Sequence, residues 1–428
     1  MNDVTVKATI DGVDSNISIS DLKLLISQAQ MPFVMDENAT FIDEGESMTG
    51  WSITNGSKTQ ANSCIRNTKS SAAGPGLSST LSKLVQYPPS GKDFLMLGGV
   101  RAKKAAGQFS VVWLLSGTKS ISIWLGSADA ATATPGAISI RGITGTTANV
   151  LQVATGVDYE NELVEFALHF DSKFNTVNCY FMRSGQPPEF AGRVKCDYFQ
   201  APSIQTVTGS MTSPGNWIEH DYLMICKPNI IGIGDSIEDG RVAFSADPSL
   251  NAVNHQSTWR AHANLLPGLR NRIVVDKGVP GNTSAQILSR VVADAIEHGP
   301  RCIFVGCSNN DYANSVSAAS RKANIQATVD TVTQSGIKCA LRNSLYGTST
   351  PVVSGSAVTN GAYLNYHKSW WDSYSSQISG VDYLVDVMAA MKNQDDWYVN
   401  PAYAGSDGVH PNVAGYTAMG SALEISIA

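Results

Sequence analysis

The residues with the clearest chemical potential are a serine at position 236 and an acid–imidazole pair near the end of the chain, Asp407 and His410. Ser236 closes the stretch "IIGIGDS", and the pair lies in "GSDGVHPN". An imidazole that is oriented by a carboxylate can take the proton of a serine hydroxyl, and the oxygen can then attack an ester carbonyl. The pattern therefore predicts nucleophilic catalysis, with Ser236 as nucleophile, His410 as general base and Asp407 as the residue that orients the base.

Two other stretches offer hydrogen-bond donors for the negative charge that such an attack places on the carbonyl oxygen. Gly281 lies in "GVPGNTS", and an amide without a neighbouring Cβ lets an oxyanion approach closely. Asn310 lies in "FVGCSNND", and its side-chain NH₂ can donate to the same oxygen. Taken alone, Ser236 could equally be a helix N-cap. Together the stretches predict an oxyanion hole made by Ser236, Gly281 and Asn310, in a site that requires no metal and no cofactor.

The elements that must bring these residues together form an alternating pattern from residue 228 onward. Short apolar runs, typical of strands buried on both faces, alternate with helix-compatible segments. The runs are "NIIGIG", "NRIVVDKG", "RCIFVGC", "IKCALRNS" and "DYLVDVM", and the main helical segments are "TSAQILSRVVADAIEHG" and "SRKANIQATVDTVTQSG", the second closed by Gly336. This alternation predicts an α/β domain over residues 227–428 with an open parallel sheet, in which ligand sites lie at the carboxyl ends of the strands.

In this order, the four polar stretches resemble the conserved blocks of the SGNH (GDSL-type) hydrolase family. The matching residues are Ser236 for block I, Gly281 for block II, Asn310 for block III, and Asp407 and His410 for block V. The resemblance covers about residues 228–428. It implies a three-layer α/β/α domain with a parallel sheet and a carboxylic ester hydrolase that works through an acyl-enzyme.

The sequence departs from the family pattern at two places. Ser308 stands where block III of the family has glycine, so Gly306 is a candidate for the lost flexibility. Glu238 and Asp239 follow the nucleophile, where many relatives have small or apolar residues. Solvated charges at a helix start are the favoured interpretation of these two carboxylates, because the helix dipole stabilises anions there. Repulsion of anionic substrates is the alternative.

The chain before residue 227 has the two-residue period of short strands. Runs such as "FSVVWLLSG", "SISIWLGS", "AISIRGIT", "ELVEFALHFD" and "TVNCYFMRSG" end in turn residues. They predict an all-β, jelly-roll or lectin-like sandwich over residues 33–226, in which Trp51, Trp113 and Trp124 pack rather than bind sugar. Residues 1–32 combine the strand-like "VTVKATI" with the helical "SDLKLLISQAQ". We expect this segment to serve in attachment or oligomerisation, with terminal disorder as the alternative.

Bulk properties exclude several classes of protein. Charged residues make up 15% of the 428 residues and the net charge is −6, with no basic cluster of the kind that nucleic-acid binding requires. The seven cysteines show no zinc-like spacing and are expected to be free and mostly buried. No run approaches the length of a membrane span, and the start of the chain lacks the features of a signal peptide. We expect a soluble protein that neither spans a membrane nor binds nucleic acid.

Three aromatic residues are candidates for contact with a substrate. Tyr403 lies four positions before Asp407, and Trp370 and Trp371 lie in "SWWDSY". Aromatic faces in a cleft can stack on sugar rings, although core packing is the alternative for each residue.

The overall layout resembles bacteriophage tail-fibre and tailspike polysaccharide deacetylases. That resemblance implies removal of acetyl groups from a bacterial surface polysaccharide, a capsule or an O-antigen. It also implies a homotrimer on the virion tail, outside the cell without a signal peptide, with possible virion attachment through the N-terminus. One alternative is a non-catalytic receptor-binding adhesin on an SGNH scaffold. Another is a bacterial short-chain or lipid esterase, which an acyl-length series would reveal.

Overall fold

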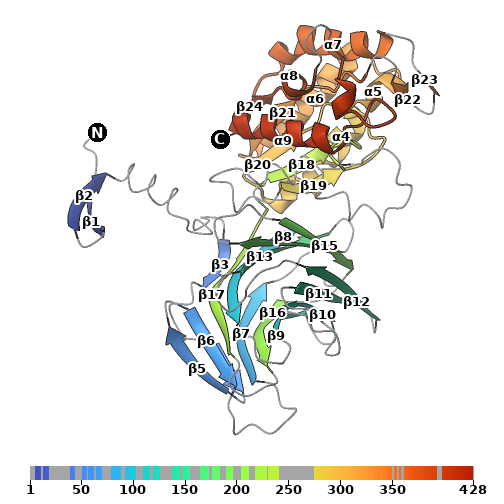
Figure 1. The fold of residues 1–428 in the computed structure, drawn as a ribbon. Coiled ribbons are helices and arrows are strands. Elements are labelled where there is room, and N and C mark those ends of the chain that lie inside the picture. Colours follow the sequence, from blue (N-terminus) through green and yellow to red (C-terminus); the bar gives the residue numbers. More distant parts are fainter. Residues whose placement is uncertain are drawn as a thin grey trace.

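The chain forms a region of antiparallel strands followed by an α/β region (Figure 1). The change falls between β17 (Trp217–Cys226) and β18 (Ile230–Gly234), and the domain boundary near residue 227 stays a prediction. This computed structural model describes residues 5–10, 13–18, 39–43, 51–54, 56–61, 64–69, 79–87, 92–102, 109–115, 119–125, 137–144, 147–154, 164–172, 176–183, 189–195, 204–211, 217–228, 230–240, 274–348, 351–353, 356–357, 361–392 and 398–427.

A parallel sheet of five strands organises the α/β region. Its order is β19-β18-β20-β21-β24, with every neighbouring pair parallel. β18 is the first strand of this sheet along the chain, and it lies between β19 and β20, the second and the third. The strand order therefore reverses at β18. Such a switch point opens a crevice at the carboxyl ends of the strands. The strands besides β18 are β19 (Val274–Gly278), β20 (Cys302–Val305), β21 (Lys338–Arg342) and β24 (Tyr383–Val385).

Helices cover both faces of this sheet (Figure 1). Alternate residues of a strand point to opposite faces, so Ile230 packs into one core while Ile231 and Ile233 pack into the other. One face is covered by α4 (Ser284–Asp294), α6 (Ala318–Gln334) and α7 (Ala362–Tyr374), the other by α8 (Val387–Met391) and α9 (Val413–Ile427). The predicted α/β fold with a parallel sheet is confirmed for this region. Shorter elements are η5 (Ile296–His298), α5 (Asn310–Ala313), β22 (Val352–Val353), β23 (Ser356–Ala357), η6 (Ser375–Gln377) and η7 (Pro401–Tyr403).

Local signals in the sequence explain where α4 and α6 begin and where α6 ends. Before α4, the backbone N–H of Thr283 donates to the Gln286 side chain at 2.8 Å, as in a capping box. Before α6, the Ser317 hydroxyl accepts the N–H of Ser320 at 3.1 Å. The chain leaves α6 through Gly336, whose φ is 74°, so the predicted helix end is confirmed.

Between residues 39 and 226, the described strands form two antiparallel sheets. The five runs quoted from the sequence correspond to β9 to β11, β13 and β14. The packing of the two sheets as a lectin-like sandwich stays a prediction, as do the roles of Trp51, Trp113 and Trp124. One sheet has the order β12-β11-β10-β9-β16-β7-β4, and the other has the order β15-β14-β13-β8-β17-β6-β5 with β3 paired to β17. Their strands besides β17 are β3 (Ala39–Asp43), β4 (Trp51–Thr54), β5 (Gly56–Ala61), β6 (Cys64–Lys69), β7 (Ser79–Tyr87), β8 (Phe94–Ala102), β9 (Phe109–Leu115), β10 (Lys119–Leu125), β11 (Ala137–Thr144), β12 (Thr147–Ala154), β13 (Val164–Asp171), β14 (Thr176–Arg183), β15 (Glu189–Lys195) and β16 (Ile204–Met211).

The N-terminal segment contains a hairpin of β1 (Thr5–Ile10) and β2 (Val13–Ser18). The helix predicted over residues 20–30 lies outside the described residues. The attachment or oligomerisation role of residues 1–32 stays a prediction.

A buried polar cluster joins the two regions around Asp93, which directly precedes β8. The Lys277 ammonium of β19 donates to one carboxylate oxygen of Asp93 at 2.8 Å, and His169 of β13 lies 2.8 Å from the other. The backbone N–H of Asp93 donates to Nδ1 of His298 at 2.8 Å. Asp93 and Lys277 are each 2% exposed, so water does not screen their attraction. We call this set of four residues the boundary cluster.

The charges of the boundary cluster depend on one another. Burial alone would raise the pKa of Asp93, but Lys277 and then His169 outweigh it and hold that pKa far below its usual value. Burial alone would lower the pKa of Lys277, but Asp93 outweighs it and raises that pKa. Burial lowers the pKa of His298 to about 4, so this imidazole is neutral at pH 7 and can accept the Asp93 N–H.

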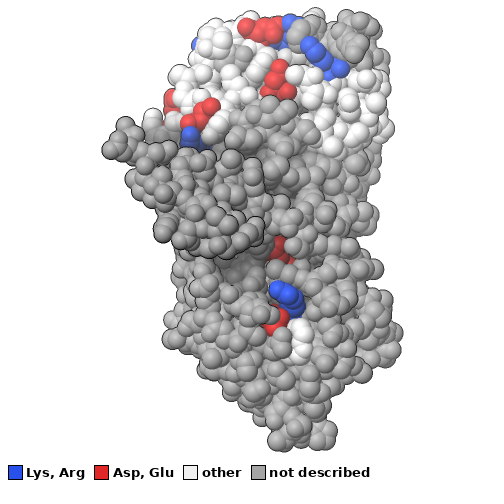
Figure 2. Space-filling model, turned by 60° about the vertical axis from the view of Figure 1, so that its left-hand side comes forward, with Lys and Arg blue, Asp and Glu red and all other residues white. Residues whose placement is uncertain are grey.

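Charged side chains of both signs lie interspersed over the α/β region on the face that Figure 2 shows. Of the helices among the described residues, none combines the length and the apolar character that crossing a membrane requires. The state of the side chain is described for four of the seven cysteines, and all four are free and buried, as predicted: Cys179, Cys302, Cys307 and Cys339.

Candidate active site

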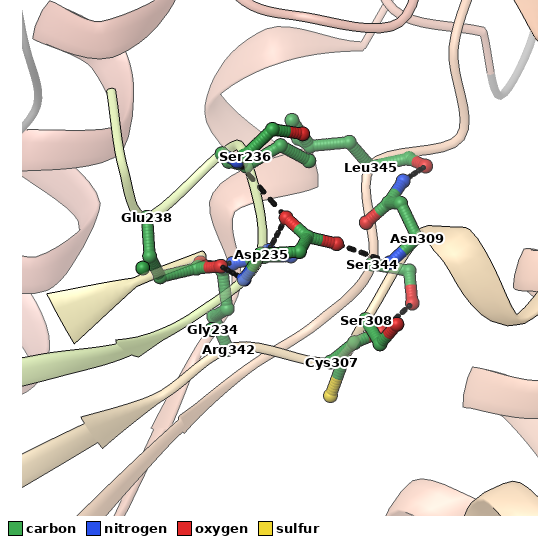
Figure 3. A network of polar contacts seen from close by, with 12 residues as sticks. Gly234, Asp235, Ser236, Glu238, Cys307, Ser308, Asn309, Arg342, Ser344 and Leu345 are labelled. Atoms are coloured by element: carbon green, nitrogen blue, oxygen red, sulfur yellow. Dashed lines mark hydrogen bonds and ion pairs between the residues drawn. The ribbon is translucent and has the colours of Figure 1, made fainter. Parts of the chain in front are cut away.

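Ser236 lies in a tight turn directly after β18, at the switch point of the parallel sheet. The Asp235 carboxylate accepts the N–H of Ile237 at 2.9 Å, and the Asp235 carbonyl accepts the N–H of Asp239 at 3.0 Å. These bonds curl the chain around the serine and hold it at the end of the strand (Figure 3). Because of this turn, the Ser236 hydroxyl lies at the carboxyl end of β18, although every residue of that strand is buried.

The structure brings Ser236, His410 and Asp407 together, although 174 positions separate the serine from the histidine. The Ser236 hydroxyl lies 2.6 Å from Nε2 of His410, and Nδ1 of His410 lies 2.5 Å from one carboxylate oxygen of Asp407. The other oxygen of Asp407 accepts the backbone N–H groups of Val409 and His410 at 2.9 and 3.0 Å. Both oxygens are thus occupied, and the imidazole is fixed with Nε2 toward the serine.

The loop that carries the aspartate and the histidine is closed by its own backbone. Gly408 has a φ of 69°, and its carbonyl accepts the N–H of Thr348 at 2.8 Å. The His410 carbonyl accepts the N–H of Gly405 at 2.7 Å. Burial opposes ionisation of Asp407, but the bond from His410 outweighs it and lowers the pKa of that carboxyl. A charged Asp407 favours a proton on Nδ1 of His410, which leaves Nε2 as the acceptor.

Gly281 lies in the turn after β19, at the same edge of the sheet. Its φ is 82°, a backbone conformation that residues with a Cβ rarely adopt. Gly281 is also exposed. The last residue of β19, Gly278, packs directly against the nucleophile turn, because a Cβ there would lie 2.1 Å from the backbone N of Asp239. Gly278 therefore brings the start of this turn into backbone contact with the serine turn, whereas a Cβ at Gly281 itself would meet nothing within 4 Å.

Asn310 begins α5 after β20 and faces both turns. Its side-chain nitrogen lies 3.3 Å from Asp235 Oδ2 and 3.2 Å from the carbonyl of Asn282. The Ser308 hydroxyl donates to the same carbonyl at 2.8 Å, so the residue that departs from the family pattern ties this segment to the Gly281 turn. Gly306 does not have a positive φ, but a Cβ there would lie 2.3 Å from Glu238 Oε2, so glycine is needed for space. The expectation that Gly306 supplies flexibility stays a prediction.

The three aromatic residues predicted to contact a substrate differ in burial. Trp370 is fully buried and lies 4.4 Å from the Arg321 guanidinium, so a substrate cannot reach it. The prediction for Trp370 is wrong because Tyr363, His367 and Trp370 form the buried stripe of α7, a helical spacing visible in the sequence. Trp371 is partly buried against the α4–α6–α7 core. Tyr403 is partly buried beside α9, and both stay candidates.

Glu238 occupies a place that the sequence analysis did not predict. It is fully buried and paired with the guanidinium of Arg342, which is also fully buried (Figure 3). The interpretation as a solvated charge is therefore wrong for Glu238, and the alternative of repelling substrate does not fit a carboxylate beneath the turn. The only hint in the sequence is an arginine that ends the apolar run "IKCALR", where a buried strand would leave its charge without water.

Two further polar residues hold the site and were missed. The backbone N–H of Asn309 donates to Asp235 Oδ2 at 2.7 Å, and its side chain donates to the carbonyl of Leu345 at 2.7 Å. Arg290 of α4 donates to the carbonyl of Lys277 at 2.6 Å and to the Asn282 side chain at 2.7 Å. No spacing in the sequence distinguishes these residues, because their partners come from other segments.

Comparison with known proteins agrees with this geometry. The model of the GDSL-like Lipase/Acylhydrolase family matches residues 233–418, which include Ser236, Gly281, Asn310 and the Asp407–His410 loop. This part of the chain is similar to that family, and the match supports an ester hydrolase. None of the curated proteins compared matches the chain.

Several solved structures are similar to 46% of the chain. A GDSL-like lipase from Bacteroides thetaiotaomicron is 19% identical over 86% of its own length, with a TM-score of 0.35. A catalytic mutant of an acetylxylan esterase from Geobacillus stearothermophilus is 21% identical over 94% of its length, with a TM-score of 0.36. A lipolytic protein of the G-D-S-L family from Desulfitobacterium hafniense is 19% identical over 98% of its length, with a TM-score of 0.36.

Proposed function

We propose that the α/β region hydrolyses acetyl esters through Ser236, His410 and Asp407. The observation that carries this proposal is the continuous hydrogen-bonded chain from the serine hydroxyl through the imidazole to the carboxylate. The serine is 9% exposed and the histidine side chain is 23% exposed, so both border solvent at the sheet edge. A substrate carbonyl can therefore reach the hydroxyl from outside.

In the first half of the reaction, Nε2 of His410 takes the proton of Ser236 while the serine oxygen bonds to the ester carbon. The carbonyl oxygen becomes an oxyanion, and the amides of Ser236 and Gly281 and the side chain of Asn310 are its proposed donors. When this intermediate collapses, His410 gives its proton to the leaving alkoxide. An alcohol departs and an acyl-enzyme remains.

Water completes the reaction. His410 takes a proton from a water molecule, whose oxygen attacks the acyl carbon of the acyl-enzyme. Collapse of the second intermediate returns a proton to Ser236 and releases the carboxylic acid. Asp407 stays ionised throughout and stabilises the protonated imidazole.

For the substrate, we propose an acetylated bacterial surface polysaccharide, a capsule or an O-antigen. The low charge content and the antiparallel region ahead of the esterase support this proposal, since a second domain that holds a polymer raises the concentration of its acetyl groups at the site. The layout further favours a bacteriophage tail-fibre or tailspike protein, with a homotrimeric assembly on the virion tail and attachment through the N-terminus. Tyr403 and Trp371 are candidates for stacking on sugar rings.

The experiment that tests the esterase is hydrolysis of p-nitrophenyl acetate by the full chain and by Ser236→Ala. We expect turnover by the wild-type protein and background rates for the variant. Equal background rates would reject the esterase and favour a receptor-binding adhesin.

A second experiment tests the acyl group and the polymer. We expect acetyl esters to react faster than octanoyl esters, and acetate to be released from at least one member of a panel of purified capsules and O-antigens. Faster turnover of octanoyl esters would favour a lipid esterase and reject the deacetylase. Light scattering on the intact chain tests the homotrimer.

A further inference from the structure

We propose that Glu238 and Arg342 are positioning residues, whose buried ion pair fixes the nucleophile turn and, through Asp235, the oxyanion donor Asn310. This inference rests on the proposed function, because it assigns the pair a part in the same reaction. Neither side chain touches a substrate, since both are fully buried beneath the turn.

The carboxylate of Glu238 holds the turn from below. One oxygen accepts the backbone N–H of Asp235 at 3.0 Å, and the other accepts Nε of Arg342. Asp235 is the residue directly before the serine, so Glu238 fixes the backbone at the point where β18 ends. The carboxylate does for this turn what a capping side chain does for a helix start.

The surrounding backbone leaves room for this carboxylate at two glycines. A Cβ at Gly234 would lie 1.9 Å from Glu238 Oε2, and a Cβ at Gly306 would lie 2.3 Å from the same atom. The two glycines come from the ends of β18 and β20, the strands that flank the switch point. An alanine at either position cannot coexist with Glu238 in this place, so the site is built around a buried carboxylate.

Arg342 extends the contact from the turn toward the oxyanion donor. Its Nη1 donates to the carbonyl of Asn343 at 2.8 Å, and its Nη2 lies 4.0 Å from Asp235 Oδ1. The Asp235 carboxylate in turn lies 3.3 Å from the side-chain nitrogen of Asn310. Figure 3 shows this carboxylate between the serine turn and Asn309, the residue before Asn310. A continuous chain of polar contacts therefore runs from Arg342 through Glu238 and Asp235 to Asn310.

The charges show why this pair is sensitive to substitution. Glu238 and Asp235 are both fully buried carboxylates, and Arg342 is the cation that contacts both. Burial raises the pKa of Glu238, and the Arg342 guanidinium opposes that rise. Without the guanidinium, two carboxylates would face each other out of water, and the turn would have to shift or take up a proton.

A role confined to stability would make different predictions from a positioning role. If the pair only stabilises the fold, removing it lowers the melting temperature and leaves kcat of the folded protein unchanged. If it positions the turn, kcat falls while KM stays, because the substrate is still bound but the serine and Asn310 are misplaced. A displacement of about 1 Å is enough to cost about 100-fold in rate.

The test compares Glu238→Gln, Arg342→Lys and Lys338→Gln in the full chain with p-nitrophenyl acetate. Glu238→Gln keeps the shape of the side chain and removes its charge, so we expect kcat to fall about 10- to 100-fold with KM nearly unchanged. Arg342→Lys keeps the cation, whereas a further variant, Arg342→Met, removes it. We expect Arg342→Lys to retain more activity than Arg342→Met. Lys338 is exposed at the start of the same strand, so Lys338→Gln is the matched control and should behave as wild type.

Hydrogen exchange of the folded variants gives a second readout that does not depend on turnover. We expect Glu238→Gln to speed exchange of the amides in residues 235–240 and 309–310 and to leave α6 unchanged. Folded Glu238→Gln protein with wild-type kcat and wild-type exchange would overturn the inference. Absence of Ser236-dependent turnover in the wild-type protein would instead reject the proposed function, while the exchange result still decides whether the pair holds the turn.

Discussion

Two buried ion pairs in this chain have the same chemistry and different surroundings. Lys277 and Asp93 meet where the antiparallel region contacts the parallel sheet, and Glu238 and Arg342 meet beneath the nucleophile turn. Asp93 also lies within bonding distance of His169 and Ser172, so its carboxylate is well compensated. By contrast, Arg342 faces two carboxylates, and its Nη2 has no hydrogen-bond partner among the residues that the structure describes.

The difference teaches what each pair does. A buried pair with all its hydrogen bonds made can hold two segments together, and losing one partner leaves an uncompensated charge. In the Glu238–Arg342 pair, the guanidinium Nη2 is left without a hydrogen bond and lies 4.0 Å from the carboxylate next to the serine, so the same cation acts on a third group. We therefore expect the boundary cluster to act on stability and the Glu238–Arg342 pair to act on rate.

The largest effect on kcat is expected in the loop that carries Asp407 and His410. Its loss of rate is the reference for the effects of the two ion pairs. Asp407→Asn should lower kcat about 10⁴-fold, because the amide favours the wrong tautomer of His410 while the geometry stays intact. The measurement is steady-state hydrolysis of p-nitrophenyl acetate, with the melting temperature as the control for folding. A loss of less than tenfold would mean that Asp407 does not orient the base.

Lys277→Met breaks the boundary cluster and should lower the free energy of unfolding by about 3–5 kcal/mol, because Asp93 is left buried without its cation. The kcat of the folded protein should stay nearly unchanged. Urea unfolding provides the stability, and the double variant with Asp93→Asn should recover part of the loss. An equal loss in the double variant would show that charge compensation is not the cause.

Asn310→Ala tests the far end of the polar chain that begins at Arg342. Removing an oxyanion donor typically costs about 10²–10³-fold in kcat. The KM should change little, since the bond forms mainly in the transition state. In a double variant with Glu238→Gln the two losses should be less than multiplicative, because both act on the same donor. Independent, fully multiplicative losses would argue against the connection through Asp235.

The smallest effect is expected from the titration of His298. The pKa of this imidazole falls from 6.5 to about 4 in the fold, so the unfolded chain takes up the proton first as the pH drops. Its contribution to stability is complete above pH 6.5 and is lost between about pH 6.5 and pH 4, for a total of about 3 kcal/mol. Asp93, Lys277, Lys92, His169 and Glu297 are charged or titratable groups that interact with it.

Urea unfolding at a series of pH values between 7.5 and 4.5 measures this loss. His298→Gln keeps an acceptor for the Asp93 N–H and removes the titration, so its stability should depend less on pH in that window. An unchanged pH dependence in His298→Gln would assign the loss to other groups.

The sequence by itself determined the parallel sheet, its main helices and the residues that meet at its edge. Buried parallel strands must be apolar throughout, and their ends must carry the polar residues of a site, so both features are written along the chain. Ser236, Gly281 and Asn310 each follow such a strand, and Asp407 and His410 are close enough in sequence for one loop to hold both.

Only the tertiary structure decided which charged residues lie inside. Glu238 and Arg342 are 104 positions apart, and Lys277 and Asp93 are 184 apart. A lone charge in a sequence has the same appearance whether water or a distant partner will surround it. Whether a charged side chain loses its water depends on how distant segments pack around it and its partner. A local sequence pattern contains no information about that packing. For the same reason, the type of residue at position 370 alone allowed Trp370 to be predicted in a substrate cleft, whereas the orientation of α7 places its side chain in the core.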